Sequence, residues 1–292
     1  MSEIKSFAVG EGDMFYVNHG NDSFTIIDCC LDGDTDERIL NEVDALRRLK
    51  SLTRFISTHP DEDHIGGLHL LDERIGIVNF YCVENKATKP DQTDSFDRYC
   101  ELRDADKAFY LFQNCSRKWL NDSDDTRRSS GITIVWPVTG NADYQSALHA
   151  AAEGESPNNI SPIIKYSLKD GANVLWMGDL ETEFMESISD SLDLPAVDIL
   201  FAPHHGRDTG KVPESMLTEM SPKIVVIGEA PSEHLNYYEG YDTITQNSAG
   251  DIVFDCVGAK VHVFCSNEYE VDFLDDENQA RDGLCYVGTL NL

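Results

Sequence analysis

The sequence has little positive charge. Its 23 lysine and arginine residues stand against 53 aspartate and glutamate residues, so the formal net charge of the 292-residue chain is −30 at pH 7. Such a surface repels polyanions at long range, which argues against unassisted, non-specific binding of nucleic acid. Hydrophobic residues (41%) and charged residues (26%) are otherwise present at the levels of an ordinary globular protein, so the acidity by itself indicates a well-solvated surface.

Long apolar runs, targeting signals and paired cysteines are also missing. No stretch approaches the roughly 18 consecutive apolar residues of a membrane span, and residues 1–5 lack the basic region and apolar run of a secretory signal. The eight cysteines are scattered without a Cys-x-x-Cys pair, and several lie in apolar runs, as Cys82, Cys256 and Cys265 do. We expect reduced core cysteines and a cytoplasmic protein without membrane attachment.

Strand-like segments occur in two batches, each accompanied by helices. The first batch comprises strands at 6–9, 14–17, 24–27, 54–58 and 77–83, with an amphipathic helix at 34–49. The second comprises strands at 132–136, 163–167, 174–177, 199–202, 224–227, 252–254 and 261–264, with helices at 142–152 and 180–192. Two such batches predict two packed sheets with helices outside, in a single α/β (α+β) domain over residues 1–292. The polar segment 91–130 is expected to form a helical insertion over the site.

The most informative segment is His59-Pro60-Asp61-Glu62-Asp63-His64, at the end of the predicted strand 54–58. Pro60 cannot continue a β ladder, so the chain turns there and directs two imidazoles and three carboxylates at a common region. Crowded carboxylates are electrostatically costly unless a cation offsets them, and imidazole with carboxylate suits zinc, manganese or iron. The alternative is an acidic surface loop with incidental histidines. The sequence favours a metal site because further motifs agree with it.

This segment resembles the His-x-His-x-Asp-His signature of the metallo-β-lactamase fold superfamily. It resembles still more closely the His-Pro-Asp-x-Asp-His-x-Gly-Gly version in the soluble hydrolase domain of the DNA-uptake protein ComEC. The likeness continues in order along the chain: residues 9–13 (Val-Gly-Glu-Gly-Asp), 26–28 (Ile-Ile-Asp), 158–161 (Asn-Asn-Ile-Ser), 177–181 (Met-Gly-Asp-Leu-Glu), 203–206 (Pro-His-His-Gly) and 246–252. Single elements are weak signals, whereas the ordered set is specific.

The resemblance implies a four-layer αββα sandwich with two divalent ions, zinc or manganese, at one edge. In that family the ligand histidine directly precedes glycine, which favours His205 over His204 and leaves His204 as a catalytic or substrate-facing group. Asp63 or Asp179 would orient the attacking hydroxide. The implied metal ligands are His59 and Asp61 for the first ion, Asp63, His64 and His205 for the second, and Asp179 as the bridge.

Two departures from the superfamily pattern affect the first ion. Asp61 stands where the superfamily usually has histidine, which favours oxygen-preferring ions such as manganese. The separate histidine expected before the Gly-Asp element is absent, its region holding Asn158 and Asn159, which we interpret as substrate-binding residues. The first ion would therefore be held weakly, and His149 is a further candidate for the missing ligand.

Several other residues have two open interpretations. Arg207 replaces a serine of the ComEC pattern, and it would either reach a phosphate of the substrate or be an ordinary surface arginine. Asp13 and Asp28 are expected to be hydrogen-bond anchors of the site loops and not ligands. The remaining histidines are expected to pack, face solvent or act structurally: His19, His69, His234 and His262.

The expected activity is that of a binuclear metal-dependent hydrolase acting through a metal-bound hydroxide. Resemblance to the ComEC domain suggests a phosphodiesterase or nuclease, and the charge favours a small nucleotide or partner-delivered nucleic acid over free duplex. The same kind of site could open lactones, thioesters or β-lactams. A hypothesis of another class is a partner-dependent effector, or a structural subunit of a multi-protein assembly, with weak or dormant hydrolase activity.

Overall fold

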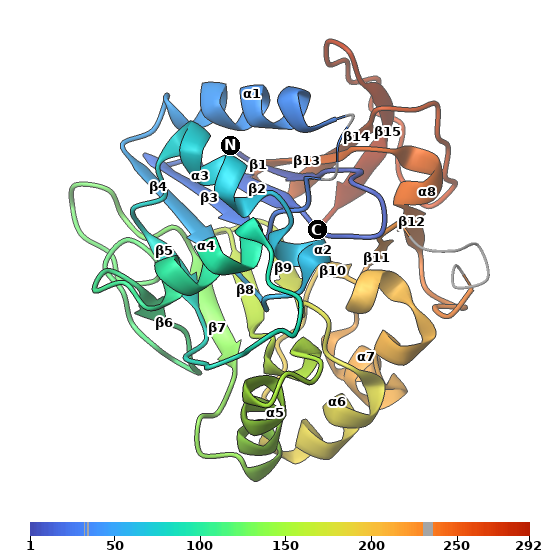
Figure 1. Cartoon of the computed structure of the whole chain (residues 1–292). Helices are drawn as coiled ribbons and strands as arrows, with labels where there is room; N and C mark the ends of the chain where they lie inside the picture. Colours follow the sequence, from blue (N-terminus) through green and yellow to red (C-terminus); the bar gives the residue numbers. More distant parts are fainter. Residues whose placement is uncertain (32, 34, 230–235) are drawn as a thin grey trace.

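The structure is a computed structural model that describes residues 1–31, 33, 35–229 and 236–292 (Figure 1). Its described strands form a nine-stranded and a six-stranded sheet. The first sheet has the order β15 (Cys285–Asn291), β14 (Lys260–Cys265), β13 (Ile252–Val257), β1 (Ser2–Ser6), β2 (Phe15–Asn18), β3 (Ser23–Ile27), β4 (Leu52–Ile56), β5 (Phe80–Cys82) and β6 (Phe109–Tyr110). The second has the order β12 (Thr243–Thr245), β11 (Ile224–Ile227), β10 (Ile199–Phe201), β9 (Asn173–Trp176), β8 (Ile163–Ser167) and β7 (Ile132–Trp136).

Helices cover the outer face of each sheet (Figure 1). On the first sheet, α1 (Asp36–Arg47), α3 (Leu68–Ile75) and α4 (Asp94–Arg103) bury apolar side chains against the strands, among them Ile39, Leu71 and Tyr99. On the second sheet lie α5 (Ala142–Ala152), α6 (Thr182–Ile188) and α7 (Glu214–Met220). The inner faces of the two sheets pack on each other around residues such as Phe15, Trp176 and Phe201. These four layers confirm the predicted αββα sandwich.

Some elements differ from the sequence-based expectation. The first strand is β1 (Ser2–Ser6) and not residues 6–9, because Lys5 is buried through ion pairs with Glu42 (2.8 Å) and Asp251 (3.0 Å), which hides the strand's alternation. Strands β12 and β15 and helices α7 and α8 (Gln246–Ala249) were not predicted. The predicted start of the first helix, Asp34, lies outside the described residues.

The segment 91–130 contains a single helix among its described elements, α4, followed by β6 and an irregular stretch. The first part lies beside the predicted site loop, where Thr93 Oγ1 donates to Glu62 (2.7 Å). The second part reaches the opposite end of the first sheet, where the Asn21 side chain donates to the carbonyls of Arg127 and Ser129. The structure therefore places only the beginning of this segment near the site.

The two parallel runs of strands decide where side chains can converge. β3, β4, β5 and β6 are mutually parallel in the first sheet, as are β9, β10, β11 and β12 in the second. The loops that follow β3, β4, β9 and β10 meet at one edge of the sandwich and carry the predicted site residues. No helix in the described part of the chain is long and apolar enough to cross a membrane.

Candidate metal centre

Three of the nine non-glycine residues with positive φ in the described part of the chain lie in the predicted site loops. Asp28, directly after β3, and the consecutive pair His204 and His205, after β10, have positive φ angles of 56°, 53° and 57°. Such values are unusual for residues with a β-carbon and persist where the surrounding structure holds them in place. Before Asp179, Gly178 has φ of 53°, and a β-carbon there would lie 2.6 Å from Ser161 Oγ. These turns bring the side chains that follow the strands into one cluster.

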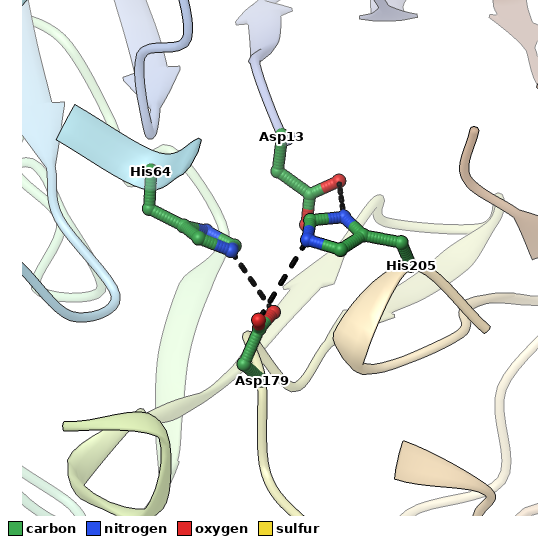
Figure 2. A group of neighbouring side chains, drawn as sticks. All are labelled: Asp13, His64, Asp179 and His205. Carbon is green, nitrogen blue, oxygen red and sulfur yellow. Dashed lines mark hydrogen bonds and ion pairs between the residues drawn. The ribbon is translucent and has the colours of Figure 1, made fainter. Parts of the chain in front are cut away.

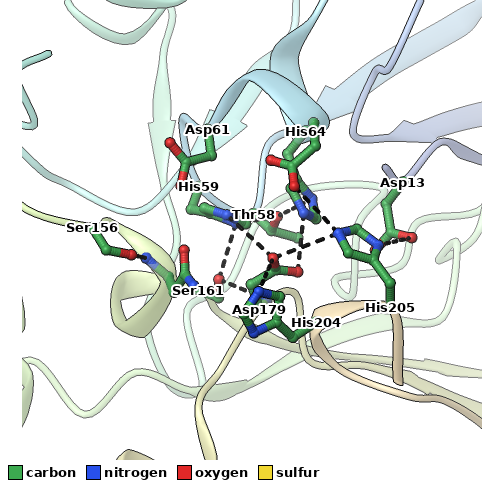
Figure 3. Close-up of polar contacts among 12 residues, drawn as sticks. Asp13, Thr58, His59, Asp61, His64, Ser156, Ser161, Asp179, His204 and His205 are labelled. Carbon is green, nitrogen blue, oxygen red and sulfur yellow. Dashed lines mark hydrogen bonds and ion pairs between the residues drawn. The ribbon is translucent and has the colours of Figure 1, made fainter. Parts of the chain in front are cut away.

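Four imidazoles of the cluster are each held through Nδ1, and Figure 3 shows the partners of His59 and His205. His64 Nδ1 lies 2.9 Å from Asp28 Oδ2, and His205 Nδ1 lies 3.3 Å from Asp13 Oδ1. His59 Nδ1 lies 3.1 Å from Thr58 Oγ1 and 3.2 Å from Ser161 Oγ, while His204 Nδ1 lies 2.9 Å from Thr209 Oγ1. Partners on Nδ1 fix both the orientation of an imidazole and the nitrogen that it offers elsewhere.

All four Nε2 atoms then face the carboxylate of Asp179. His64 Nε2 lies 3.0 Å from Oδ1, and the distances to Oδ2 are 3.7 Å from His205, 3.8 Å from His204 and 3.9 Å from His59. Figure 2 shows Asp179 below His64 and His205, with Asp13 behind His205. Asp63 adds a second carboxylate, since its Oδ2 lies 3.4 Å from His205 Nε2.

In the metal-free cluster, buried carboxylates and imidazoles shift each other's pKa values. Burial lowers the pKa of His64, but Asp179 and Asp28 raise it well above the ordinary value. Burial lowers the pKa of His205 as well, but Asp13, Asp179 and Asp63 together raise it to about 10. Burial would raise the pKa of Asp179, yet the imidazoles of His64 and His205 hold it well below its usual range. Burial and His64 lower the pKa of His59 to about 3, so that this imidazole is neutral at pH 7.

The donor set fits divalent metal ions. His59 Nε2 is a buried atom without a hydrogen-bond partner among the described residues, and the buried atoms His64 Nε2 and Asp179 Oδ1 face each other at 3.0 Å. Buried polar atoms are rarely left unpaired, and imidazole nitrogens with carboxylate oxygens are ligands of zinc, manganese and iron. One group of atoms within 4.8 Å of one another comes from Asp13, His64, Asp179 and His205, and a second comes from His59, Asp63 and His64.

A comparison with known protein families identifies the superfamily of the chain. The sequence profile of the Metallo-beta-lactamase superfamily matches residues 8–189, more than half of the chain. The chain belongs to the metallo-β-lactamase superfamily. A search of curated protein sequences finds no match.

Two solved structures show similarity at low sequence identity. Igni18, described as a novel metallo hydrolase from the hyperthermophilic archaeon Ignicoccus hospitalis, is 18% identical, with a TM-score of 0.48 over 87% of this chain and 99% of that one. The metallo-β-lactamase SMB-1, solved in a complex with mercaptoacetic acid, is 12% identical, with a TM-score of 0.36 over 68% of this chain and 79% of that one.

Three residues predicted as metal ligands or substrate-binding groups have other partners in the structure. The Asp61 carboxylate is turned away from Asp179 (Figure 3), and its Oδ1 lies 3.1 Å from Lys89 Nζ. Arg207 Nη2 donates to Glu11 Oε2 at 2.8 Å. Both polar atoms of the Asn159 side-chain amide contact Glu181: Oδ1 accepts from the Glu181 backbone N–H, and Nδ2 donates to Glu181 Oε2. These contacts do not show the expected ligand or substrate-binding role of any of them.

Two further candidates from the sequence are Asn158, expected to bind substrate, and His149, considered as the missing metal ligand. Asn158 is buried in the short 3-10 helix η1 (Asn158–Ile160), and its backbone N–H lies 3.4 Å from Ser156 Oγ. His149 lies on α5 and lines a different cavity with residues such as Tyr110, Phe112 and Gln145. The structure therefore does not bring His149 to the cluster.

The expectation that Asp28 is an anchor is confirmed. Its Oδ1 accepts the backbone N–H of Thr58 (2.7 Å), and its Oδ2 accepts the Thr58 hydroxyl (2.6 Å) in addition to facing His64. Asp13 contacts His205 in the same manner and also belongs to the metal-capable group. Sequence reasoning did not assign roles to Thr58 and Ser161, although Ser161 is the serine of the Asn-x-Ser element.

Other histidines have partners away from the centre. His19 Nε2 lies 2.8 Å from Thr25 Oγ1, His69 Nδ1 lies 3.2 Å from Ser95 Oγ, and His262 Nδ1 lies 2.7 Å from Thr289 Oγ1. These contacts agree with the packing or structural roles expected for them. His234 lies outside the described residues.

Proposed function

We propose that the protein is a binuclear metal-dependent hydrolase that cleaves phosphodiesters. The observation that carries the proposal is the convergence of four oriented Nε2 atoms on the carboxylate of Asp179. His59 and His64 follow β4 of the first sheet, whereas His204, His205 and Asp179 follow β10 and β9 of the second sheet, so both sheets contribute to one centre. Membership of the superfamily supports the hydrolase class, because its members are metal-dependent hydrolases.

Some residues of the cluster would bind the metal ions, and others orient the imidazoles that bind them. Asp179 would bridge two ions, His64, His205 and Asp63 would hold one of them, and His59 would hold the other. Zinc or manganese would suit this mixture of nitrogen and oxygen donors. Ions bound here would lower the pKa of water to about 7 and polarise the scissile bond. Asp28 and Asp13 orient imidazoles through Nδ1, and such partners commonly change metal affinity 10- to 100-fold when removed.

His204 is the imidazole best placed to handle a proton. Its side chain is 14% exposed, whereas those of His59, His64 and His205 are inaccessible. Burial and His205 lower its pKa although Asp179 opposes this, so the ring is neutral at neutral pH. Thr209 holds Nδ1, which leaves Nε2 to exchange a proton with a substrate or leaving group.

The phosphodiester class is supported by the ordered resemblance to the soluble hydrolase domain of ComEC. The acidity of the chain adds a restriction, because a protein with a net charge of −30 gains no general attraction for a polyanion. Two cationic side chains lie beside the loops of the cluster, and both are paired with acidic residues: Arg207 with Glu11 and Lys89 with Asp61. These features favour a small nucleotide, or nucleic acid delivered by a protein partner.

Metal analysis combined with a substrate panel tests the proposal. Protein purified without chelator should contain close to two equivalents of zinc or manganese, or one tight and one exchangeable equivalent. It should hydrolyse a bis-(p-nitrophenyl) phosphate substrate faster than matched lactone, thioester and β-lactam substrates. Activity on one of the other substrates alone would contradict the phosphodiester assignment. Absence of metal even after soaking would contradict the two-ion site.

A further inference from the structure

Lys89 lies at the edge of the metal cluster and is held there by several groups. Its Nζ lies 3.1 Å from Asp61 Oδ1, 3.5 Å from Glu62 Oε1 and 5.7 Å from the centroid of the Phe96 ring. The side chain is only 17% exposed. A lysine on an open surface is mobile and strongly hydrated, whereas this ammonium group has partly exchanged water for two carboxylates and an aromatic face.

The neighbours of Lys89 are themselves fixed. The preceding residue, Thr88, ties this segment to the end of α5, since its N–H donates to the Ala151 carbonyl and its hydroxyl to the Ala152 carbonyl, both at 3.0 Å. From the other side, Thr93 Oγ1 donates to Glu62 Oε1 at 2.7 Å. Lys89 is therefore a positioned counter-ion of the loop that carries the metal-site residues.

The main chain of Asp61 is fixed, so its carboxylate can change partners only by rotation of the side chain. Its backbone carbonyl accepts the N–H groups of His64 and Ile65, both at 2.9 Å, which fixes the main chain at the start of α2 (Glu62–Ile65). Two residues earlier, His59 Nε2 is buried and has no hydrogen-bond partner in the described part of the chain. The superfamily pattern would give this imidazole the residue at position 61 as a companion ligand, whereas in this structure that residue contacts Lys89.

We propose that Lys89 holds Asp61 out of the metal centre and thereby keeps the ion position beside His59 weak. This inference rests on the proposed two-ion function. The second position differs, because His64 and His205 already have carboxylates within 3.5 Å and need no rotation of a side chain. The protein consequently binds one ion tightly and one weakly. Neutralising Lys89 frees Asp61 to rotate towards the weak position.

Calorimetric titration of the chelator-treated full chain with manganese tests the proposal. The variants are Lys89→Met, Asp61→Asn and the double variant, with Lys86→Met as the matched control. Lys86 is a nearby lysine paired with Asp104 (3.1 Å), so its replacement makes the same change in net charge away from the metal loop. Lys89→Gln provides a second neutral variant should Lys89→Met fold poorly, and circular dichroism confirms folding.

The expected result is a double-mutant pattern. Lys89→Met should tighten the weak manganese position by about tenfold relative to Lys86→Met, which is the size of effect that one organising group has on metal affinity. Asp61→Asn alone should change either position little, and in the double variant it should cancel the gain. The tight position should be unaffected throughout.

Other results would overturn the proposal. Equal affinities for Lys89→Met and Lys86→Met would show that Lys89 does not restrain a ligand. Loss of the weak position in Asp61→Asn alone would show that Asp61 already binds the ion in the wild type. In both cases the wild type still binds two ions, so the proposed function stands. A wild type that binds no manganese or zinc overturns the proposed function together with this inference.

Discussion

His204 and Asp179 face each other across the carboxyl ends of β10 and β9. His204 Nε2 lies 3.8 Å from Asp179 Oδ2, and the backbone N–H of His204 donates to the carbonyl of Gly178 at 3.0 Å. The same Oδ2 atom lies 3.7 Å from His205 Nε2. Two consecutive histidines in left-handed backbone conformation thus point at one carboxylate oxygen from two directions.

Alanine substitutions separate the roles of these two histidines. His205 is buried and contacts Asp13 and Asp63, so His205→Ala should lower metal content below one equivalent and abolish hydrolysis. The His204 imidazole is more exposed, and among the described residues the Thr209 hydroxyl is the hydrogen-bond partner recorded for it, so His204→Ala should keep most of the metal and lose mainly turnover. Elemental analysis and steady-state rates check both, and the reverse pattern would exchange the assignments.

Asp28→Asn should weaken metal binding although Asp28 is not itself expected to bind the metal. The carboxylate accepts hydrogen bonds from the Thr58 N–H and hydroxyl and faces His64 Nδ1, and an amide would present an N–H₂ group to one of these donors. We expect a loss of affinity of 10- to 100-fold, typical of groups that orient a metal ligand. Competition with a chromogenic chelator measures it.

Asp22→Asn is the control for that change. Asp22 also accepts a backbone N–H, that of Ser51 at 2.8 Å, but at the opposite end of the first sheet. Its replacement should leave metal affinity unchanged. Equal losses in both variants would mean that the effect of Asp28 is one of general stability.

Gly178 and Gly258 allow steric fit to be separated from backbone conformation. Their φ angles are 53° and 59°, so alanine is strained at both, by roughly 1–2 kcal/mol. A β-carbon at Gly178 would lie 2.6 Å from Ser161 Oγ and 3.0 Å from Thr58 Cβ, whereas one at Gly258 would have no atom within 4 Å. In urea unfolding, Gly178→Ala should therefore lose more stability than Gly258→Ala, and of the two it alone should weaken metal binding. Equal behaviour would refute the tight fit at Gly178.

The stability of the metal-free protein should depend on pH through His205. Burial acts against it, but Asp13, Asp179 and Asp63 raise the pKa of His205 from 6.5 to about 10. A group whose pKa is higher in the folded state contributes stability that is fully present below its unfolded pKa and is lost as the pH rises through the folded one. Urea midpoints with chelator should fall between pH 6.5 and 10.

Two comparisons test the origin of that fall. In the zinc-loaded protein a ligating His205 carries no proton, so the contribution from its titration should disappear. His205→Gln without metal should likewise show a smaller fall. If the chelated variant loses as much stability over this pH range as the wild type, another group is responsible.

Much of the centre could be predicted because it lies directly after strands. His59, Asp63 and His64 follow β4, Asp179 follows β9, and His205 follows β10, so short motifs indicated both chemistry and position. The fold class followed similarly from the two batches of strand-like segments. Contacts that depend on tertiary packing were not accessible in this way.

Lys89 illustrates the part that the sequence does not reveal. It lies in an irregular segment with no periodicity, and its position depends on hydrogen bonds between Thr88 and the end of α5. Its contact with Asp61 sets that side chain apart from the cluster, which motif matching alone could not predict. Strand β1 is comparable, since burial of Lys5 depends on Glu42 and Asp251 from distant segments.

Asp179→Asn tests the centre most directly. The carboxylate is buried and faces four imidazoles, so its charge is what allows cations, whether protons or metal ions, to gather there. Asparagine has nearly the same shape but no charge, so the fold should survive while the second equivalent of metal is lost. Hydrolysis of bis-(p-nitrophenyl) phosphate should fall by about 10³-fold or more, as expected when two ions no longer share a bridging ligand. Rates and metal content are measured together, with Asp198→Asn as control, because Asp198 pairs with Lys223 (3.1 Å) away from the cluster. A fully active Asp179→Asn protein with two bound ions would show that Asp179 does not bridge them.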